Sequence, residues 1–171
     1  SKWEELRKLS GTTYDKTVTV GLVAKYVDNS DTYISVTEAL KAAAYHNQVN
    51  LKVKWLNAEK VTDDDFASVD GLVVPGGFGV RGLDGKIAAA NYALAHDKPY
   101  LGLCLGLQMA VIAAARRGGL SDATSAEINP DSNEDVVYIM EGQQGKESTG
   151  GTMRLGDYPA KLKKGSRVSQ I

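Results

Sequence analysis

The chain alternates short apolar segments that have the period of β-strands with longer segments that have the period of helices. Val18, Val20 and Leu22 occupy every second position of 17–24, which predicts a half-buried strand. Further strands are predicted at 51–56, 71–74 and 98–103, with a helical segment before each. Four such repeats predict a doubly wound α/β fold, in which a mostly parallel sheet carries helices on both faces and functional loops at the carboxyl ends of its strands.

The helical segments carry recognisable start signals. Ser30 or Asp31 is a candidate cap for a helix whose apolar positions recur at helical spacing as far as Ala44. Asp84 is predicted to cap an alanine-rich helix that ends at His96. The other helical stretches are 63–66, which is short and weak, and 105–117.

The two ends of the chain depart from this repeat. Residues 1–15 are predicted to be an interdomain linker with a short helix at 3–9, and 16–171 to be one domain, a size that suits a single core. Beyond Gly118 the pattern weakens into polar turns, with strands predicted at 136–140 and around 152–162. The start without methionine and the isolated first helix indicate a piece of a longer protein.

The charge balance argues against nucleic acid and membrane partners. Twenty Lys and Arg residues face 21 Asp and Glu residues, so the net charge is -1. The most apolar run, 101–115, is shorter than the roughly 20 residues that cross a bilayer. A single cysteine and the lack of a charged-then-apolar leader favour a cytoplasmic location.

The segment Gly102-Leu103-Cys104-Leu105-Gly106 lies where a predicted strand meets a predicted helix. This is the context of a nucleophile elbow, in which glycines near the nucleophile allow a tight, strained turn. The helix that follows presents its positive end to the sulfur and favours the thiolate. Cys104 is therefore the candidate nucleophile. The alternative is that Cys104 is a small buried apolar residue, as free cysteines often are.

A thiolate that attacks a carbonyl creates an oxyanion, and backbone N–H groups can stabilise it. Leu105 follows the nucleophile, and Gly77 ends the loop after the strand 71–74, so both are candidate donors. Segment 77–82 also matches the dinucleotide fingerprint, but that motif opens its helix inside the glycines and usually follows the first strand. A plain turn at 75–77 is the remaining alternative, since a P-loop does not fit the spacing.

A cysteine hydrolase needs a general acid and base, and the sequence contains two histidines, His46 and His96. Each ends a predicted helix that leads into a strand, so each is expected at the sheet edge opposite Cys104. A five-residue strand spans about 16 Å, far more than the roughly 3 Å of a nucleophile–base contact. We therefore expect the base to come from outside this chain.

Several motifs together resemble the glutaminase domain of CTP synthases, a class I glutamine amidotransferase with a flavodoxin-like fold. They cover nearly the whole chain and are 23–26 (VAKY), 31–40 (DTYISVTEAL), 75–82 (PGGFGVRG) with Gly85-Lys86, 101–108 (LGLCLGLQ) and 150–156 (GGTMRLG). The last of these motifs distinguishes the chain from other amidotransferases. Ala126, Ala113 and Arg117 depart from the pattern without affecting the nucleophile.

The resemblance implies that Cys104 attacks the side-chain amide of glutamine, forms a glutamyl thioester and releases ammonia. Gly77 and Leu105 would bind the oxyanion, and Gln108 and Glu127 would bind the glutamine. The family's catalytic His and Glu would follow shortly after residue 171. No metal or cofactor is implied for this domain.

The resemblance also implies partners. A synthetase domain of the same protein would use Mg-ATP to activate UTP and would receive the ammonia to make CTP, and the enzyme would be a homo-oligomer, a tetramer. GTP would be an activator near Arg81 and Gly82, although Val80 and Asp84 match that expectation only loosely. Two alternatives remain: a stand-alone cysteine hydrolase of the same fold, such as a glutamyl hydrolase or DJ-1-like protein, and a catalytically silent binding module.

Overall fold

The computed structural model describes residues 1–139, 157 and 159–170. The chain divides into two units, Ser1–Tyr138 and Ile139–Ile171, and each is treated by itself. The described part of the second unit is irregular apart from a 3₁₀ turn, η2 (Arg167–Ser169). The first unit contains the sheet and every element discussed below.

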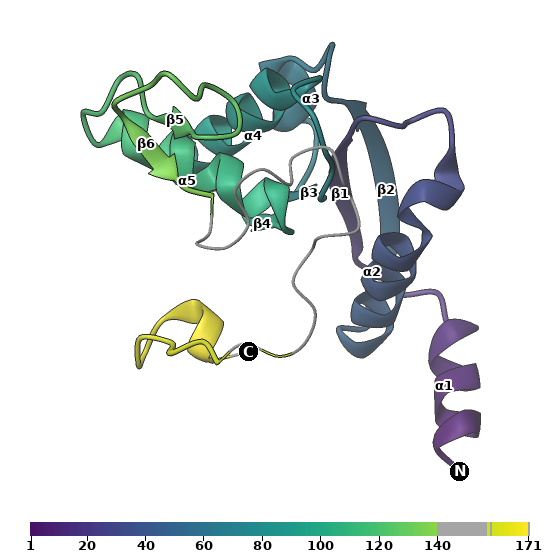
Figure 1. Ribbon diagram of the computed structural model, residues 1–171. Helices are drawn as coiled ribbons and strands as arrows, with labels where there is room; N and C mark the ends of the chain where they lie inside the picture. Colours follow the sequence, from purple (N-terminus) through teal and green to yellow (C-terminus); the bar gives the residue numbers. More distant parts are fainter. Residues whose placement is uncertain (140–156, 158, 171) are drawn as a thin grey trace. The chain divides into compact units, whose positions relative to one another are not determined.

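A parallel sheet with intervening helices forms the first unit (Figure 1). Its elements follow one another as β1 (Thr17–Ala24), η1 (Ser30–Tyr33), α2 (Ile34–His46), β2 (Asn50–Asn57), α3 (Asp63–Ala67), β3 (Gly71–Val74), α4 (Leu83–Ala95), β4 (Tyr100–Gly102) and α5 (Leu105–Arg117). The strands lie in the order β2-β1-β3-β4, and all three pairings are parallel. The predicted doubly wound α/β fold is confirmed.

The strand order reverses beside β1. The chain passes from β1 to β2 on one side and then returns to β3 on the other side of β1, so the loops that leave β1 and β3 diverge. In open α/β sheets this switch point is where ligands bind, outside the carboxyl ends of the strands. The segments that start there are Lys25 after β1, Pro75 after β3 and, one strand further, Leu103 after β4.

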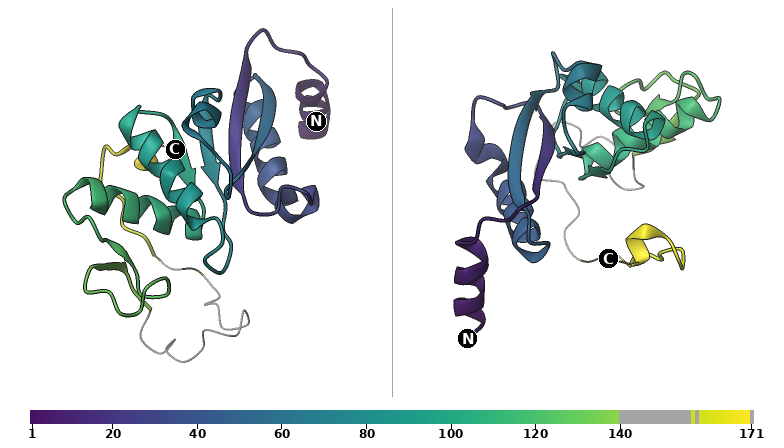
Figure 2. Two further views of the ribbon diagram at one scale, coloured as in Figure 1. Left: turned by 90° about the horizontal axis from the view of Figure 1, so that it is seen from above. Right: turned by 180° about the vertical axis from the view of Figure 1, so that it is seen from behind.

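Helices cover both faces of the sheet (Figure 2). On one face, Leu22 and Ala24 pack with Tyr33 and with partly buried residues of α2. On the other face, Val23, Leu72 and Val74 pack with Phe66 of α3 and with Ala89 and Ala93 of α4, and α5 packs on α4. Alternate residues of one strand therefore serve opposite cores, as the two-residue period requires.

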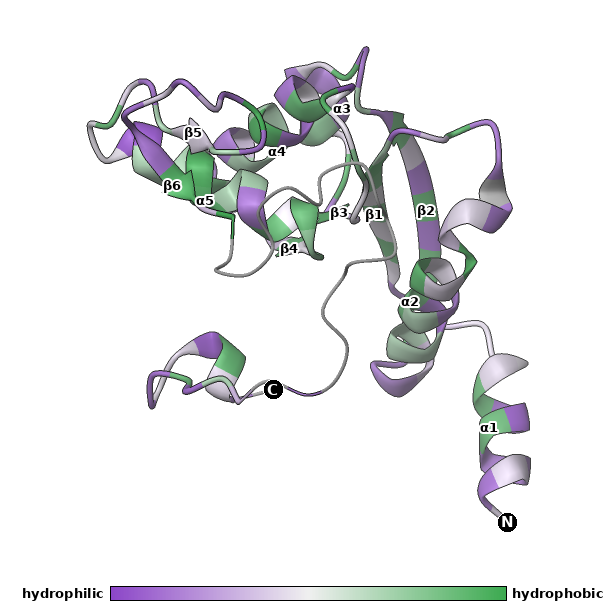
Figure 3. Ribbon diagram, in the orientation of Figure 1, coloured by the Kyte–Doolittle hydropathy of each residue, from purple (hydrophilic) through white to green (hydrophobic). Residues whose placement is uncertain are grey.

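The hydropathy colouring follows these layers (Figure 3). Strand β3 and the facing sides of α4 and α5 are largely apolar, and β2 alternates between polar and apolar residues. The N-terminal helix α1 (Lys2–Ser10) buries no residue and leaves Trp3 79% exposed. A helix with no buried face draws its stability from its caps, here a capping box between Ser1 and Glu4. The boundary between a linker at 1–15 and the domain stays a prediction.

Two predicted helix starts were wrong. Helix α4 begins at Leu83 with Gly82 as its N-cap, so Asp84 lies inside the first turn rather than at the cap. Gly82 has φ +73°, a left-handed conformation that favours glycine, and this lets the glycine loop run directly into the helix. Before α2, Asn29 rather than Ser30 or Asp31 supplies the cap, because its side chain accepts from the N–H of Asp31 and starts η1.

The strand boundaries also differ from the prediction. β4 is shorter than 98–103 because Pro99 has no N–H for the ladder, although its carbonyl still accepts from Leu72. The strand predicted at 136–140 is β6 (Asp135–Val137), and its partner β5 (Thr124–Ser125) was not predicted. Of the strand predicted around 152–162, residues 157 and 159–162 are not strand, and the others lie outside the described residues.

Helix α5 packs unusually closely on the end of β3, at Gly106. A Cβ atom placed on Gly106 would lie 1.9 Å from the carbonyl oxygen of Val74, which is backbone and cannot rotate away. Any side chain at this position would push α5 off the sheet and carry Cys104 with it. Gly118, at the other end of the same helix, meets only the carbonyls of its own last turn, at 3.3 and 3.4 Å.

We expect Gly106→Ala to lower the free energy of unfolding by about 3 kcal/mol or more, because the overlap is with backbone. Gly118→Ala is the matched control and should cost less than about 1 kcal/mol, since Gly118 has φ -78°. Urea unfolding monitored by circular dichroism measures both. Equal stabilities of the two variants would contradict the close packing described here.

Candidate active site at the Cys104 elbow

Cys104 joins β4 to α5 in a strained backbone conformation. It is the N-cap of α5, with φ 54° and ψ -111°, and its side chain is exposed. A residue with a Cβ atom seldom adopts a positive φ, and such strain gathers at functional sites. Gly102, two residues earlier, makes the turn possible, because a Cβ there would lie 2.5 Å from the backbone of Gly106 and Leu107.

The glycine loop after β3 lies directly beside this elbow. A Cβ placed on Gly76 would lie 3.4 Å from Cys104 Cβ and 3.9 Å from Cys104 Sγ, and one placed on Gly77 would lie 3.8 Å from Leu105 Cδ2. In the part of the chain that the structure describes, the N–H groups of Gly77 and Leu105 have no hydrogen-bond partner. These two N–H groups lie in the segments that flank the sulfur, so both are candidate donors to an oxyanion.

Lys86, in the first turns of α4, is completely buried beneath this loop. Its Nζ donates to the carbonyl oxygens of Pro75 at 2.7 Å and of Gly76 at 3.3 Å. Burial, together with the nearby charge of Lys25, lowers the pKa of Lys86 to about 8, although Cys104 opposes the change. Lys86 belongs to one of the family motifs in the sequence, but no role at the site was predicted for it.

Lys25, the residue after β1, binds the other half of the same loop. Its Nζ donates to the carbonyl oxygens of Phe78 at 2.5 Å and of Gly79 at 3.0 Å, and its own N–H donates to the hydroxyl of Tyr33. Burial, and then the charge of Arg81, lowers the pKa of Lys25. Loop 75–79 is thus fastened by two lysines from two different elements.

Of the two residues predicted to bind glutamine, one lies close to the elbow. Gln108 is one turn beyond Cys104 on α5, and its N–H donates to the Cys104 carbonyl at 3.3 Å, so the two residues share a face of the helix. Glu127 follows β5 on an exposed loop, and its N–H donates to Ser125 Oγ. The described contacts do not join Glu127 to Cys104.

The residues predicted for an effector lie at the far end of the glycine loop. Arg81 Nε is 3.3 Å from Glu59 Oε1, and its guanidinium lies 5.4 Å from the ring centre of Tyr26. Gly82 is the N-cap of α4. A hollow of about 410 Å³ includes Gly82 but not Arg81, and it is lined by Ala58, Glu59, Val61, Gly82, Asp84, Gly85 and Ala88.

Both histidines lie where the sequence pattern predicted. His46 ends α2 just before β2, and His96 caps the end of α4 before β4, with its ring stacked on Tyr92 at 4.0 Å. These positions belong to the amino ends of the strands, whereas Cys104 follows the carboxyl end of β4. Neither histidine can reach the sulfur.

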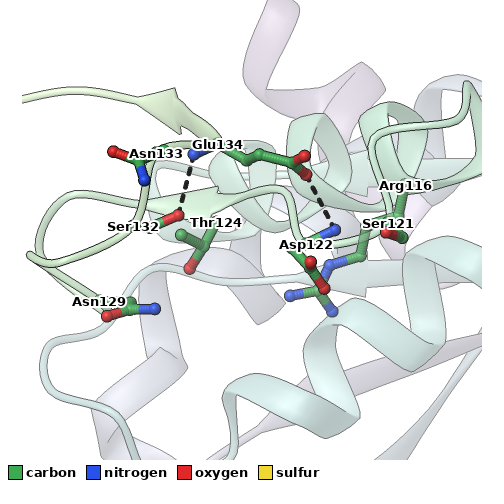
Figure 4. A pocket seen from close by; sticks show the side chains of 8 residues that line it. All are labelled: Arg116, Ser121, Asp122, Thr124, Asn129, Ser132, Asn133 and Glu134. Carbon is green, nitrogen blue, oxygen red and sulfur yellow. Dashed lines mark hydrogen bonds between the residues drawn. The ribbon is translucent and has the colours of Figure 1, made fainter.

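A larger polar hollow of about 690 Å³ lies near the opposite end of α5 (Figure 4). It is lined by Arg116, Ser121, Asp122, Thr124, Asn129, Ser132, Asn133 and Glu134. The carboxylate of Glu134 accepts from the N–H of Asp122 at 3.0 Å. Because a 13-residue helix is about 20 Å long, this hollow is separate from the elbow, and it includes none of the predicted site residues.

Comparison with known proteins gives this site a family. The model of the family "Glutamine amidotransferase class-I" matches residues 29–171. The chain therefore belongs to the class I glutamine amidotransferase family.

In the described residues, no helix is long and apolar enough to cross a membrane.

The similar relatives indicate a particular class of enzyme within this family. CTP synthase of Bacillus subtilis (strain 168) is 46% identical over 177 residues, which cover 100% of this chain and 33% of the relative. CTP synthase of Corynebacterium kroppenstedtii is 47% identical over 181 residues, which cover 98% of this chain and 32% of the relative. The chain thus spans about a third of the length of these relatives.

A solved structure with the same fold supports the assignment. The Trypanosoma brucei CTPS glutaminase domain with bound acivicin is 38% identical, with a TM-score of 0.70, over 75% of this chain and 52% of that chain. The resemblance to the glutaminase domain of CTP synthases, expected from the sequence motifs, is confirmed.

The lowered pKa of Lys86 has a consequence for stability. Its folded-state pKa is about 8 and its ordinary value 10.5, so between these pH values the unfolded chain binds more protons than the folded one. Stability contributed by Lys86 should therefore rise with pH across that window. We expect the unfolding free energy of the wild-type chain, minus that of Lys86→Met, to increase from pH 8 to 10.5 in urea titrations. A flat difference would contradict a lowered pKa of Lys86 in the folded chain.

Proposed function

We propose that this chain is the glutaminase domain of a CTP synthase, which hydrolyses glutamine at Cys104 to supply ammonia for the amination of UTP. The observation that carries the proposal is the elbow itself: Cys104 has a positive φ and lies beside the N–H groups of Gly77 and Leu105, which have no hydrogen-bond partner among the described residues. The similar CTP synthases and the acivicin-bound glutaminase domain support the choice of substrate.

In the first step, the Cys104 thiolate attacks the side-chain amide carbon of glutamine, and a C–S bond forms. The carbonyl oxygen becomes negative, and the N–H groups of Gly77 and Leu105 stabilise it. Collapse of this intermediate breaks the C–N bond, and the nitrogen takes up a proton and leaves as ammonia. Gln108, one turn beyond the nucleophile, would bind the substrate, and the Glu127 carboxylate would bind its ammonium group.

In the second step, water attacks the glutamyl thioester, loses a proton and releases glutamate with the regenerated thiolate. Both steps need a proton carrier near the sulfur. His46 and His96 lie at the opposite end of the strands, so we place this role outside the histidines of this chain. The family resemblance implies a His and Glu pair for it.

The ammonia would pass to a synthetase domain of the same protein. That domain would bind Mg-ATP and UTP, and the whole enzyme would act in the cytoplasm as a homotetramer. GTP would activate the glutaminase near Arg81 and Gly82, whose loop is continuous with the oxyanion loop. In the free chain the Arg81 guanidinium contacts Glu59 and Tyr26, so an effector would have to replace or share these contacts.

A hybrid enzyme tests the proposal. This chain would replace the corresponding third of B. subtilis CTP synthase, to which it aligns over its whole length. We expect the hybrid to make CTP from UTP with glutamine. Glutamine hydrolysis by the 171-residue chain alone should be about 100- to 10,000-fold slower than that of the hybrid, because neither of its two histidines lies near Cys104.

Cys104→Ser in the hybrid is the matched control. It should abolish CTP formation from glutamine while CTP formation from added ammonium chloride persists, since free ammonia bypasses the glutaminase. A hybrid that uses ammonia but not glutamine, with Cys104 intact, would refute the proposed function. Full glutamine turnover by the isolated chain would show that our exclusion of His46 and His96 is wrong.

A further inference from the structure

Lys86 has surroundings that stability alone does not explain. A buried ammonium ion is costly unless it is paired, yet Lys86 is fully buried and, within the described ranges, no carboxylate oxygen lies within 4 Å of its Nζ. Its partners are two successive backbone carbonyls, those of Pro75 and Gly76. The ammonium group of Lys86 therefore holds two peptide groups in place next to the nucleophile.

The hydrogen bond from Lys86 Nζ to the Gly76 carbonyl also determines the direction of an N–H group, because a trans peptide is planar. The C=O of one residue and the N–H of the next lie in one plane and point in opposite directions. The Gly76 carbonyl points at Lys86 Nζ, so the N–H of Gly77, in the same peptide group, points away from Lys86. Without that contact, a peptide between two glycines could rotate easily.

The reacting group would lie beside this peptide. A Cβ placed on Gly76 would lie 3.9 Å from Cys104 Sγ, and one placed on Gly77 would lie 3.7 Å from Lys86 Nζ and 3.8 Å from Leu105 Cδ2, so this peptide lies between the lysine and the elbow. We propose that Lys86 is a positioning residue that aims the Gly77 N–H at the oxyanion. This inference rests on the proposed function only for the identity of the natural substrate.

Lys25 completes the arrangement without sharing the role. Its ammonium binds the carbonyls of Phe78 and Gly79, which are the next part of the loop, and so prevents the glycine segment from lifting as a whole. These two hydrogen bonds go to carbonyls beyond the peptide that contains the Gly77 N–H. Lys25 therefore limits the position of the loop, whereas Lys86 sets the direction of the donor.

An activated ester separates this role from glutamine recognition. With p-nitrophenyl acetate, the Cys104 thiolate attacks the ester carbonyl, a C–S bond forms, and the C–O bond breaks as p-nitrophenolate leaves with the electron pair. The reaction passes through an oxyanion but needs neither glutamine nor a proton donor. Iodoacetamide alkylates the same thiolate at a saturated carbon, with displacement of iodide and no oxyanion, and its pH profile reports the thiolate fraction.

In the 171-residue chain, we expect Lys86→Met to lower the acylation rate per thiolate by about tenfold or more. This is less than the 100- to 1000-fold loss of an oxyanion donor, because the Gly77 N–H is freed to rotate rather than removed. The alkylation rate per thiolate should change by less than about twofold. Lys98→Met is the matched control: Lys98 also donates to a backbone carbonyl, that of Val69, but before β4, so neither rate should change.

Equal losses in acylation and alkylation, or no loss in either, would overturn the proposal. If Lys86→Met does not fold, the wild-type chain decides: labelled with ¹⁵N and ¹³C, it should show a scalar coupling between Lys86 Nζ and the Gly76 carbonyl carbon, and the absence of this coupling overturns the proposal. A wild-type chain that acylates normally, combined with a hybrid that fails with glutamine, would refute the proposed function but not the role of Lys86.

Discussion

The site depends on how closely α5 approaches the end of β3. Gly106 brings the helix to within contact of the Val74 carbonyl, and Gly102 lets the chain turn sharply enough to enter that helix. Between these glycines, Cys104 has no freedom to relax its positive φ, since both neighbouring segments are packed against backbone. The strain is maintained by the core of α4 and α5, where Met109, Ile112 and Ala113 are fully buried.

The second requirement is electrostatic. Beyond Pro75, whose side chain is fully buried, no apolar side chain of the glycine loop is buried beside Cys104, and Phe78 and Val80 are largely exposed. Two buried ammonium groups anchor it by its carbonyls instead, one from the end of β1 and one from α4. The switch point of the sheet makes this feasible, because β1 and β3 are adjacent and their loops start side by side. Burial lowers the pKa of both lysines, which is the cost of this anchoring.

Much of the fold could be predicted from the sequence, because the periods of strand and helix are local properties. The four strand–helix repeats, and the place of Cys104 at a strand–helix junction, followed from such patterns. Helix starts were less predictable. Gly82 caps α4 through its left-handed backbone, but Asp84, two residues later, is a more usual capping residue and was chosen instead. β5 has two residues and depends on pairing with β6, so no period could reveal it.

The candidate site divides in the same way. The elbow and the oxyanion loop could be predicted from the sequence, because glycines near a candidate nucleophile indicate a tight turn. The burial of Lys25 and Lys86 was not, because a lysine is ordinarily a surface residue and its environment is set by the packing of α4 on the sheet. For Glu127 the sequence predicted a role that the described contacts do not support. That role rests on the family resemblance alone, and the described contacts of Glu127 are local.

A structure of Cys104 bound to a glutamine analogue that carries an aldehyde in place of the amide would test the account most directly. The thiol adds to the aldehyde and gives a tetrahedral adduct whose oxygen marks the position of the oxyanion. We predict that this oxygen lies about 2.7 to 3.1 Å from the N–H nitrogens of both Gly77 and Leu105. An adduct whose oxygen faces solvent, or contacts a lysine side chain instead of these two N–H groups, would contradict the account.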